Sequence, residues 1–314
     1  MHNRKKLILL LVLALIVISI YVFSGITSNW DYILPRRITR VLAIIITGSV
    51  IAISTVIFQT ITNNRILTPS VIGLDSLYLL IQTFLIFVFG STSLVAQNPN
   101  INFLISLVLM VIFALFLYFV LFKKEQNVYF LLLIGLIFGT FFGSLSSFMQ
   151  VLIDPNEFMI VQNRMFASFN NVNTDILYIS IIIIILVLLY FLRFMKFLDV
   201  LSLGKEQAIN LGIDYDYVVK RLLIIVAVLV AVATALVGPI LFLGLLVANL
   251  SYEYIKTYKH TQIILGAILI SIIALVGGQL VVDRLFSFST TLSVIINFIG
   301  GIYFLYLILK ESKQ

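Results

Sequence analysis

Ten long apolar segments, separated by short polar gaps, dominate the pattern of hydrophobic and polar positions in this sequence. Most have a length close to that of a membrane-spanning α-helix, which needs about 20 residues. Because only helices and closed barrels span lipid, and these runs are continuously apolar, we predict an all-α, polytopic membrane protein with about ten transmembrane helices. The predicted spans cover residues 7–23, 41–61, 71–89, 101–122, 128–153, 176–192, 222–238, 240–255, 262–282 and 292–309.

Only the dipeptide Gly238-Pro239 separates the seventh predicted span from the eighth. Without it, residues 222–255 would form one run of 34 residues. Proline inside a helix removes a backbone hydrogen bond and bends or ends the helix. We therefore predict two spans with a tight break between them.

The first apolar segment follows a basic start, MHNRKK, which is also typical of a signal peptide. Its apolar part, residues 7–23, is already 17 residues long. That is about the minimum for a span, and many further spans follow. We therefore interpret it as an uncleaved first span.

Composition agrees with a membrane protein, because 62% of the residues are hydrophobic and only 11% are charged. Soluble domains are about half apolar and about a quarter charged. The net charge of +7 does not indicate nucleic-acid binding, since the basic residues lie in the short gaps between apolar runs. No linker or low-complexity tract divides the chain, so we predict one domain, residues 1–314.

Lysine and arginine are enriched in cytoplasmic loops, so their distribution predicts the orientation. With both termini inside, 15 of the 20 basic residues are cytoplasmic and 5 are outside. The outer five are Arg36, Arg37, Arg40, Arg164 and Arg284. We therefore predict a multi-pass membrane protein with cytoplasmic termini, whose outward arginines go against the general trend.

The sequence lacks the usual requirements for catalysis. The chain has no cysteine, no GxxxxGK[ST] phosphate loop, and only two histidines, His2 and His260, with no carboxylate cluster at ligand spacing. Asp214 and Asp216 are the nearest approach to a paired acidic motif. We predict that the chain is not an enzyme and holds no metal or cofactor.

Polar residues inside predicted spans are costly in lipid and usually face a cavity or another helix. They are Gln59, Asp75, Gln82, Gln150, Asn249, Gln279 and Asn297. Asp75 either caps the cytoplasmic end of the third span or forms a proton or cation site.

In the fifth span Gly135, Gly139 and Gly143 are followed by serines, and this stripe of small residues is either a packing seam or part of a solute pathway.

The longest polar segment, residues 193–221, is too polar to span a membrane and carries an apolar pattern. Two short helices around Gly204 and Gly212 fit it. The residues of its apolar face would be Leu201, Leu203, Ala208, Ile209, Leu211 and Ile213.

Three stretches occur in a recognisable order along the chain. They are RITRVLAIIITGSVIAISTVIFQTITNNRILTPSVIG (residues 37–73), LSLGKEQAINLGI (201–213) and GPILFLGLLVANL (238–250). Together they resemble the permease subunits of bacterial ABC importers for iron chelates and vitamin B12, the FecCD-type or type II importers. The matching positions are Arg37, Arg40, Gly48, Ala52, Ser54, Gln59, Asn64, Pro69, Gly73, Leu203, Gly204, Glu206, Ala208, Leu211, Gly212, Gly238, Pro239, Ile240, Phe242, Gly244 and Leu245.

The resemblance implies a second permease chain, cytoplasmic ATP-binding subunits and an extracytoplasmic binding protein. It implies docking of the binding protein on Arg37, Arg40 and Arg284, with Arg36 as the alternative in a neighbouring register. ATPase coupling would lie in residues 196–217, and the translocation path would run between two permease chains. The implied coupling residues are Gly204, Glu206, Ala208 and Gly212, and the implied path residues are Gly139, Gly143, Ser144 and Ser147.

The chain also departs from the family pattern, with Thr39 and Arg65 at positions usually held by proline and Ala248-Asn249 in place of Pro-His. These departures suggest a divergent branch that pairs with a different permease and imports a ferric siderophore. An ion-coupled secondary transporter is the alternative from another class. An ABC permease for another metal or for cobalamin is the alternative within the same class.

Overall fold

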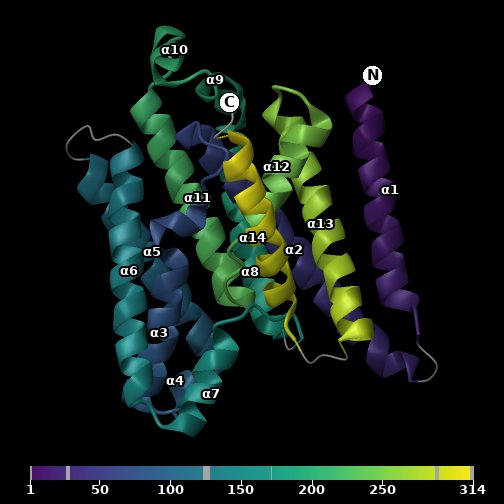
Figure 1. Ribbon diagram of the computed structural model, residues 1–314, viewed down its shortest axis with the longest axis vertical. Helices are drawn as coiled ribbons and strands as arrows, with labels where there is room; N and C mark the ends of the chain where they lie inside the picture. Colours follow the sequence, from purple (N-terminus) through teal and green to yellow (C-terminus); the bar gives the residue numbers. More distant parts are fainter. Residues whose placement is uncertain (1, 26–28, 123–127, 171, 287–289, 312–314) are drawn as a thin grey trace.

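The computed structural model describes residues 2–25, 29–122, 128–170, 172–286 and 290–311. These residues form fourteen α-helices and one 3₁₀ helix (Figure 1), which confirms the predicted all-α class. The elements are α1 (His2–Phe23), α2 (Trp30–Thr62), η1 (Pro69–Ile72), α3 (Leu74–Phe89), α4 (Leu94–Gln97), α5 (Pro99–Phe122), α6 (Val128–Leu152), α7 (Pro155–Arg164), α8 (Thr174–Leu192), α9 (Met195–Leu201), α10 (Lys205–Asn210), α11 (Tyr215–Val237), α12 (Leu243–Ile255), α13 (His260–Leu285) and α14 (Leu292–Glu311).

Each of the ten predicted spans contains one helix, but only eight helices in the described part of the chain are both long and apolar enough to cross a membrane. The two others are α3, with 16 residues, and α12, with 13. At the rise of an α-helix they measure about 24 Å and about 20 Å, short of the about 30 Å hydrocarbon core. The count of ten is therefore approximate.

Both short helices are preceded by backbone that is not α-helical and that the protein covers in part. The 3₁₀ turn η1 precedes α3, and residues 238–242 precede α12. Gly238 follows the last residue of α11 with φ +100°, and an added Cβ would lie 3.0 Å from the Cα of Ala167. Non-helical backbone at membrane depth is tolerated when protein covers it. The predicted break is confirmed, although α12 begins at Leu243 rather than at residue 240.

Helix α2 is longer than its prediction, because it begins at Trp30 rather than at residue 41. It continues through Pro35, its sixth residue, where the missing N–H leaves the carbonyl of Asp31 without its helical partner. Arg36, Arg37 and Arg40 are therefore on the helix itself. Helices α2 and α11 are buried along most of their length, whereas α1, α6, α8 and α14 expose large apolar side chains.

The helices have two distinct ends (Figure 1). The start of α1, the end of α14, and the short helices α9 and α10 lie at one end, here called the α9 end. Helices α4 and α7 lie at the other, here called the α7 end, where α2 starts and α13 finishes. Both chain termini are thus brought to the same side. Lys123, Lys124 and Lys313, which the charge count assigned to the cytoplasmic side, lie outside the described residues.

Candidate functional site

Arg40 is part of a largely buried polar cluster at the α7 end. Its Nη1 lies 3.1 Å from Asp283 Oδ2 and donates to the hydroxyl of Tyr21 at 2.9 Å. The Tyr21 hydroxyl in turn donates to Asp283 Oδ2 at 3.0 Å. The side chains of Arg40 and Asp283 are only 17% and 16% exposed. The cluster therefore joins α1, α2 and α13.

Arg37 and Arg284 both hold the end of α1. Arg37 Nη1 donates to the backbone oxygens of Tyr21, Val22 and Ser24, at 3.1, 3.0 and 2.7 Å. Arg284 Nη2 donates to the backbone oxygen of Ser24 at 2.6 Å. The last carbonyls of a helix have no partner within it, so these guanidiniums satisfy them.

The structure thus gathers all three predicted docking arginines around the C-terminal end of α1. Arg284 is exposed, whereas Arg37 and Arg40 are partly covered. Arg36 is exposed and lies with its guanidinium 4.0 Å from the ring centre of Tyr32. Asp283, which completes the cluster, was missed from the sequence. The sequence did contain a signal for it, because Asp283 is an acidic residue at the end of an apolar run and directly precedes Arg284.

The predicted coupling segment forms two short helices, α9 and α10, as expected. Gly204 lies between them with φ +101°, and Gly212 follows α10 with φ +81°. The predicted single apolar face is split: Leu201 and Ala208 are buried against the protein, whereas Leu203, Ile209 and Leu211 are 56%, 49% and 63% exposed. Glu206 is exposed as well. An apolar tip therefore projects from the α9 end.

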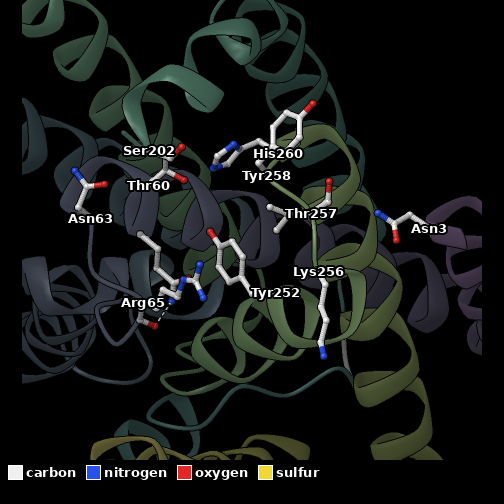
Figure 2. Close-up of a pocket in the computed structure, with 12 residues that line it drawn as sticks. Asn3, Thr60, Asn63, Arg65, Ser202, Tyr252, Lys256, Thr257, Tyr258 and His260 are labelled. Carbon is white, nitrogen blue, oxygen red and sulfur yellow. Dashed lines mark hydrogen bonds between the residues drawn. The ribbon is translucent and has the colours of Figure 1, made fainter. Parts of the chain in front are cut away.

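Helix α9 is linked to the start of α13 by Asp199 and His260. Asp199 Oδ1 accepts from the backbone N–H of His260 at 2.8 Å and lies 2.7 Å from its Nδ1. Next to this link is a cavity of about 850 Å³, shown in Figure 2, which Ser202 and His260 line. The Asp199–His260 contact therefore couples the position of α9 to the start of α13.

Two of the polar residues predicted inside spans, Gln59 and Asn249, hold the segment that follows α2. The Gln59 and Asn249 side-chain amides both donate to the backbone oxygen of Arg65, at 2.6 and 2.9 Å. The guanidinium of Arg65 lies 4.6 Å from the ring centre of Tyr252 (Figure 2). Arg65 is therefore held by two side-chain amides at its backbone oxygen and by an aromatic ring at its guanidinium.

The small-residue stripe of α6 has two parts. Gly135 and Gly139 pack against the start of α3, where a Cβ on them would lie 2.7 Å from the Cα of Ile72 and 3.3 Å from the Cα of Gly73. Nothing lies within 4 Å of a Cβ on Gly143. Ser144 and Ser147 are exposed beside it. The first part is a packing seam, and the second presents an open face of small residues.

Gly135→Ala is expected to destabilise the protein, whereas Gly143→Ala is not. The added methyl at residue 135 would overlap backbone, and overpacking of this kind costs about 1–3 kcal/mol. The melting temperatures of the two variants, purified in the same detergent, provide the measurement. Equal melting temperatures would contradict the assignment of the seam.

Asp75 is buried in the first turn of α3, at 6% exposure. It accepts a hydrogen bond from Thr234 Oγ1 of α11 at 3.2 Å. Gly73, just before α3, packs against Gly139 of α6. Asp75 therefore lies at the start of the helix in the third predicted span, and its role as a cap of that end stays a prediction. Its possible role as a proton or cation site stays a prediction.

The sequence model of the FecCD transport family matches residues 6–310 of this chain. The petrobactin import system permease protein YclO of Bacillus subtilis is 64% identical over 315 residues, covering 100% of each chain. FatC, a petrobactin import system permease protein of Bacillus anthracis, is 39% identical over 89% of this chain and 79% of FatC. YclN, another petrobactin import system permease protein of Bacillus subtilis, is only 25% identical, over 99% of each chain.

A solved structure described as an inward-facing conformation of a metal-chelate type ABC transporter has the same fold. It superposes with a TM-score of 0.83 over 98% of this chain and 99% of that chain, at 24% identity. Sequence and structure comparison therefore agree across nearly the whole chain.

Proposed function

Because this chain belongs to the FecCD transport family, we propose that it is a permease subunit of an ATP-driven ABC importer for a ferric siderophore, with petrobactin as the first candidate. The observation that carries the proposal is the 64% identity to YclO over the full length of both chains. An ion-coupled secondary transporter has no comparable support. The proposed location is a bacterial plasma membrane, with both termini and the α9 end in the cytoplasm.

A second, different permease chain is the proposed membrane partner. YclO and YclN are both named as permeases of a petrobactin import system in Bacillus subtilis, and this chain is 64% identical to one and 25% identical to the other. Two such chains in one system suggest a heterodimer, in which this chain takes the place of YclO. The exposed apolar surfaces of α6 and α14 are available for a partner as well as for lipid.

Cytoplasmic ATP-binding subunits are proposed to dock on α9 and α10. Leu203, Ile209 and Leu211 offer exposed apolar anchors there, of the kind that partner grooves bury. Gly204 and Gly212 provide the positive-φ turns around α10, Ala208 packs it against the protein, and Glu206 is free to pair across the interface. The Asp199–His260 link would pass movement of α9 to α13.

The α7 end is proposed to receive an extracytoplasmic binding protein. Arg36 and Arg284 are the exposed cations there, and acidic side chains on a partner would pair with them. Arg37 and Arg40 would act mainly by holding α1, α2 and α13 in place beneath them. The open face of α6 at Gly143, Ser144 and Ser147 would line part of the path, with Gly139 supporting it from the packing seam.

Charge reversal of both Arg36 and Arg284 to Glu is expected to weaken the affinity of the binding protein about 10-fold or more at low salt. The loss should shrink as ionic strength rises, because charge pairs at an interface rim are screened. Titration of the labelled binding protein onto the permease in nanodiscs measures it. Arg193→Glu, an exposed arginine just after α8, is the matched control. Undiminished affinity of the double variant would reject docking through these arginines.

The function itself is tested by uptake of ⁵⁵Fe-labelled ferric petrobactin into cells that lack this permease. Expression of the chain with its partner permease, ATPase and binding protein should restore ATP-dependent uptake. Omission of this chain alone should abolish it. Failure of the complete system to take up ferric petrobactin, with all subunits present in the membrane, would reject petrobactin as the substrate. A panel of other ferric siderophores then separates a different chelate from a different function.

A further inference from the structure

A second large cavity lies at the α7 end and has a volume of about 670 Å³. Its walls come from α3, α4, α5, α7, α8 and α11, together with the segment between α7 and α8 and with Thr291. Small-molecule sites in proteins usually measure about 300–1,000 Å³. The cavity is therefore large enough for a small organic ligand, at the end where the proposed importer would receive its cargo.

Arg164, the last residue of α7, lines this cavity and is held by neutral acceptors. Its Nη1 donates to Gln82 Oε1 and its Nη2 to the backbone oxygen of Ala96, each at 2.7 Å. No aspartate or glutamate is among the lining residues, and no ion pair found among the described residues includes Arg164. Partial burial lowers the pKa of Arg164, but an arginine remains charged in proteins. Its positive charge thus has no carboxylate partner in the described chain.

Asparagines in the cavity wall add N–H donors. The carboxamide oxygen of Asn170 already accepts from Gln279 Nε2 at 3.2 Å. The oxygen of Asn173 caps α8 by accepting from the backbone N–H of Asp175 at 2.8 Å. With both oxygens engaged, the side-chain NH₂ groups are what these residues can offer to a ligand.

Aromatic side chains form other parts of the wall, from Tyr78, Phe103 and Phe166. A cation, several N–H donors and aromatic surfaces therefore meet in one recess. The complementary ligand is anionic, rich in oxygen acceptors, and carries some apolar or ring surface. A single carboxylate from a docked protein would satisfy the cation but would leave most of this volume unfilled.

We propose that this cavity is a binding site for an anionic, oxygen-rich iron chelate on its outer entry into the permease, with Arg164 as its charge-recognising residue. This inference rests on the proposed import of a ferric siderophore and names a subsite for that cargo. It also assigns a role to the one predicted outward arginine for which the family resemblance implied none.

The test measures equilibrium binding of ⁵⁵Fe-labelled ferric petrobactin to the permease pair in nanodiscs, without ATPase or binding protein. Arg164→Gln should weaken binding about 10-fold or more, because it removes the charge from the strongest hydrogen-bond donor in the cavity. Arg164→Lys should retain part of the affinity. An anionic ferric tris-catecholate should compete with the probe, and an uncharged ferric hydroxamate should not.

A second pair of variants protects the test against misfolding of the Arg164 variants. Asn163 is exposed and lines the cavity, and it is not among the residues to which the Arg164 guanidinium donates. Asn163→Asp should weaken binding by adding a negative charge, whereas Asn163→Ala should leave it nearly unchanged. Arg193→Gln, at the opposite end, is the control for net charge.

Equal affinity of wild type, Asn163→Asp and Arg164→Gln would overturn the proposed site. So would a wild-type permease pair with no affinity for the chelate, or variants that lose only binding-protein docking. If the complete wild-type system imports ferric petrobactin while these variants bind and transport it normally, the site fails and the proposed function stands. If the wild-type system imports no siderophore, the proposed function itself fails.

Discussion

Arg40→Glu is expected to prevent accumulation of folded protein, an effect larger than any loss of binding-protein docking. The substitution places two carboxylates together where Arg40 now pairs with Asp283 in a largely covered site. Breaking a buried ion pair by removing one partner costs about 3–5 kcal/mol, a large part of the stability of a typical domain. Fluorescence-detected size-exclusion chromatography and thermal melting measure the amount and stability of folded protein.

The reciprocal exchange is the control for this prediction. Asp283→Arg alone should be as damaging as Arg40→Glu, and the double variant should recover much of the lost stability, because the opposite charges again face each other. Tyr21→Phe removes one hydroxyl of the same cluster and should have a smaller effect. A stable Arg40→Glu protein with impaired docking would instead support direct contact between Arg40 and the binding protein.

Leu211→Asp is the second large expected effect, and it should abolish transport without loss of the folded protein. Leu211 is 63% exposed at the tip that follows α10, so the fold does not depend on its burial. In the proposed assembly an ATPase groove would cover this side chain, and an unpaired charge there would be costly. Binding-protein-stimulated ATP hydrolysis and uptake in proteoliposomes should both fall about 10-fold or more.

Asn210→Asp is the matched variant, because it adds the same charge on the neighbouring exposed residue and removes no apolar surface. It should keep most of the transport activity. Co-purification of the ATPase with each variant shows whether the defect lies in assembly. Full activity of the Leu211→Asp variant, with normal ATPase recruitment, would place the ATPase contact elsewhere.

Local patterns accounted for most of the fold. The apolar runs located a helix in each of ten segments, and Gly238-Pro239 located the break between α11 and α12. The starts of α2, α3 and α12 were misplaced. Hydropathy measures how apolar a stretch is, and it does not distinguish helical from non-helical backbone within an apolar stretch. At η1 and at residues 238–242 the sequence is mostly apolar but the backbone does not form an α-helix.

The candidate sites divide in the same way. Positive-φ glycines and turn residues are local features, so Gly204 and Gly212 were recognisable around α10 before the structure was known. The partner of Arg40 was not, because Asp283 lies 243 residues away and is brought close only by packing of α13 against α2. The same holds for Asp75, whose hydrogen-bond donor Thr234 lies 159 residues away in the chain.

The amino-acid sequence by itself determined that this protein is an all-helical membrane permease, because apolar length, the charge bias of the loops and three short motifs are properties of contiguous residues. Only the tertiary structure decided which polar residues face one another. It placed Arg40, a predicted docking residue, in a largely covered ion pair with Asp283, and it placed Arg164 in an amide-lined cavity. The physical reason is that the energy of a charge in a protein depends on the partners and solvent around it, and these come from helices far apart in the chain.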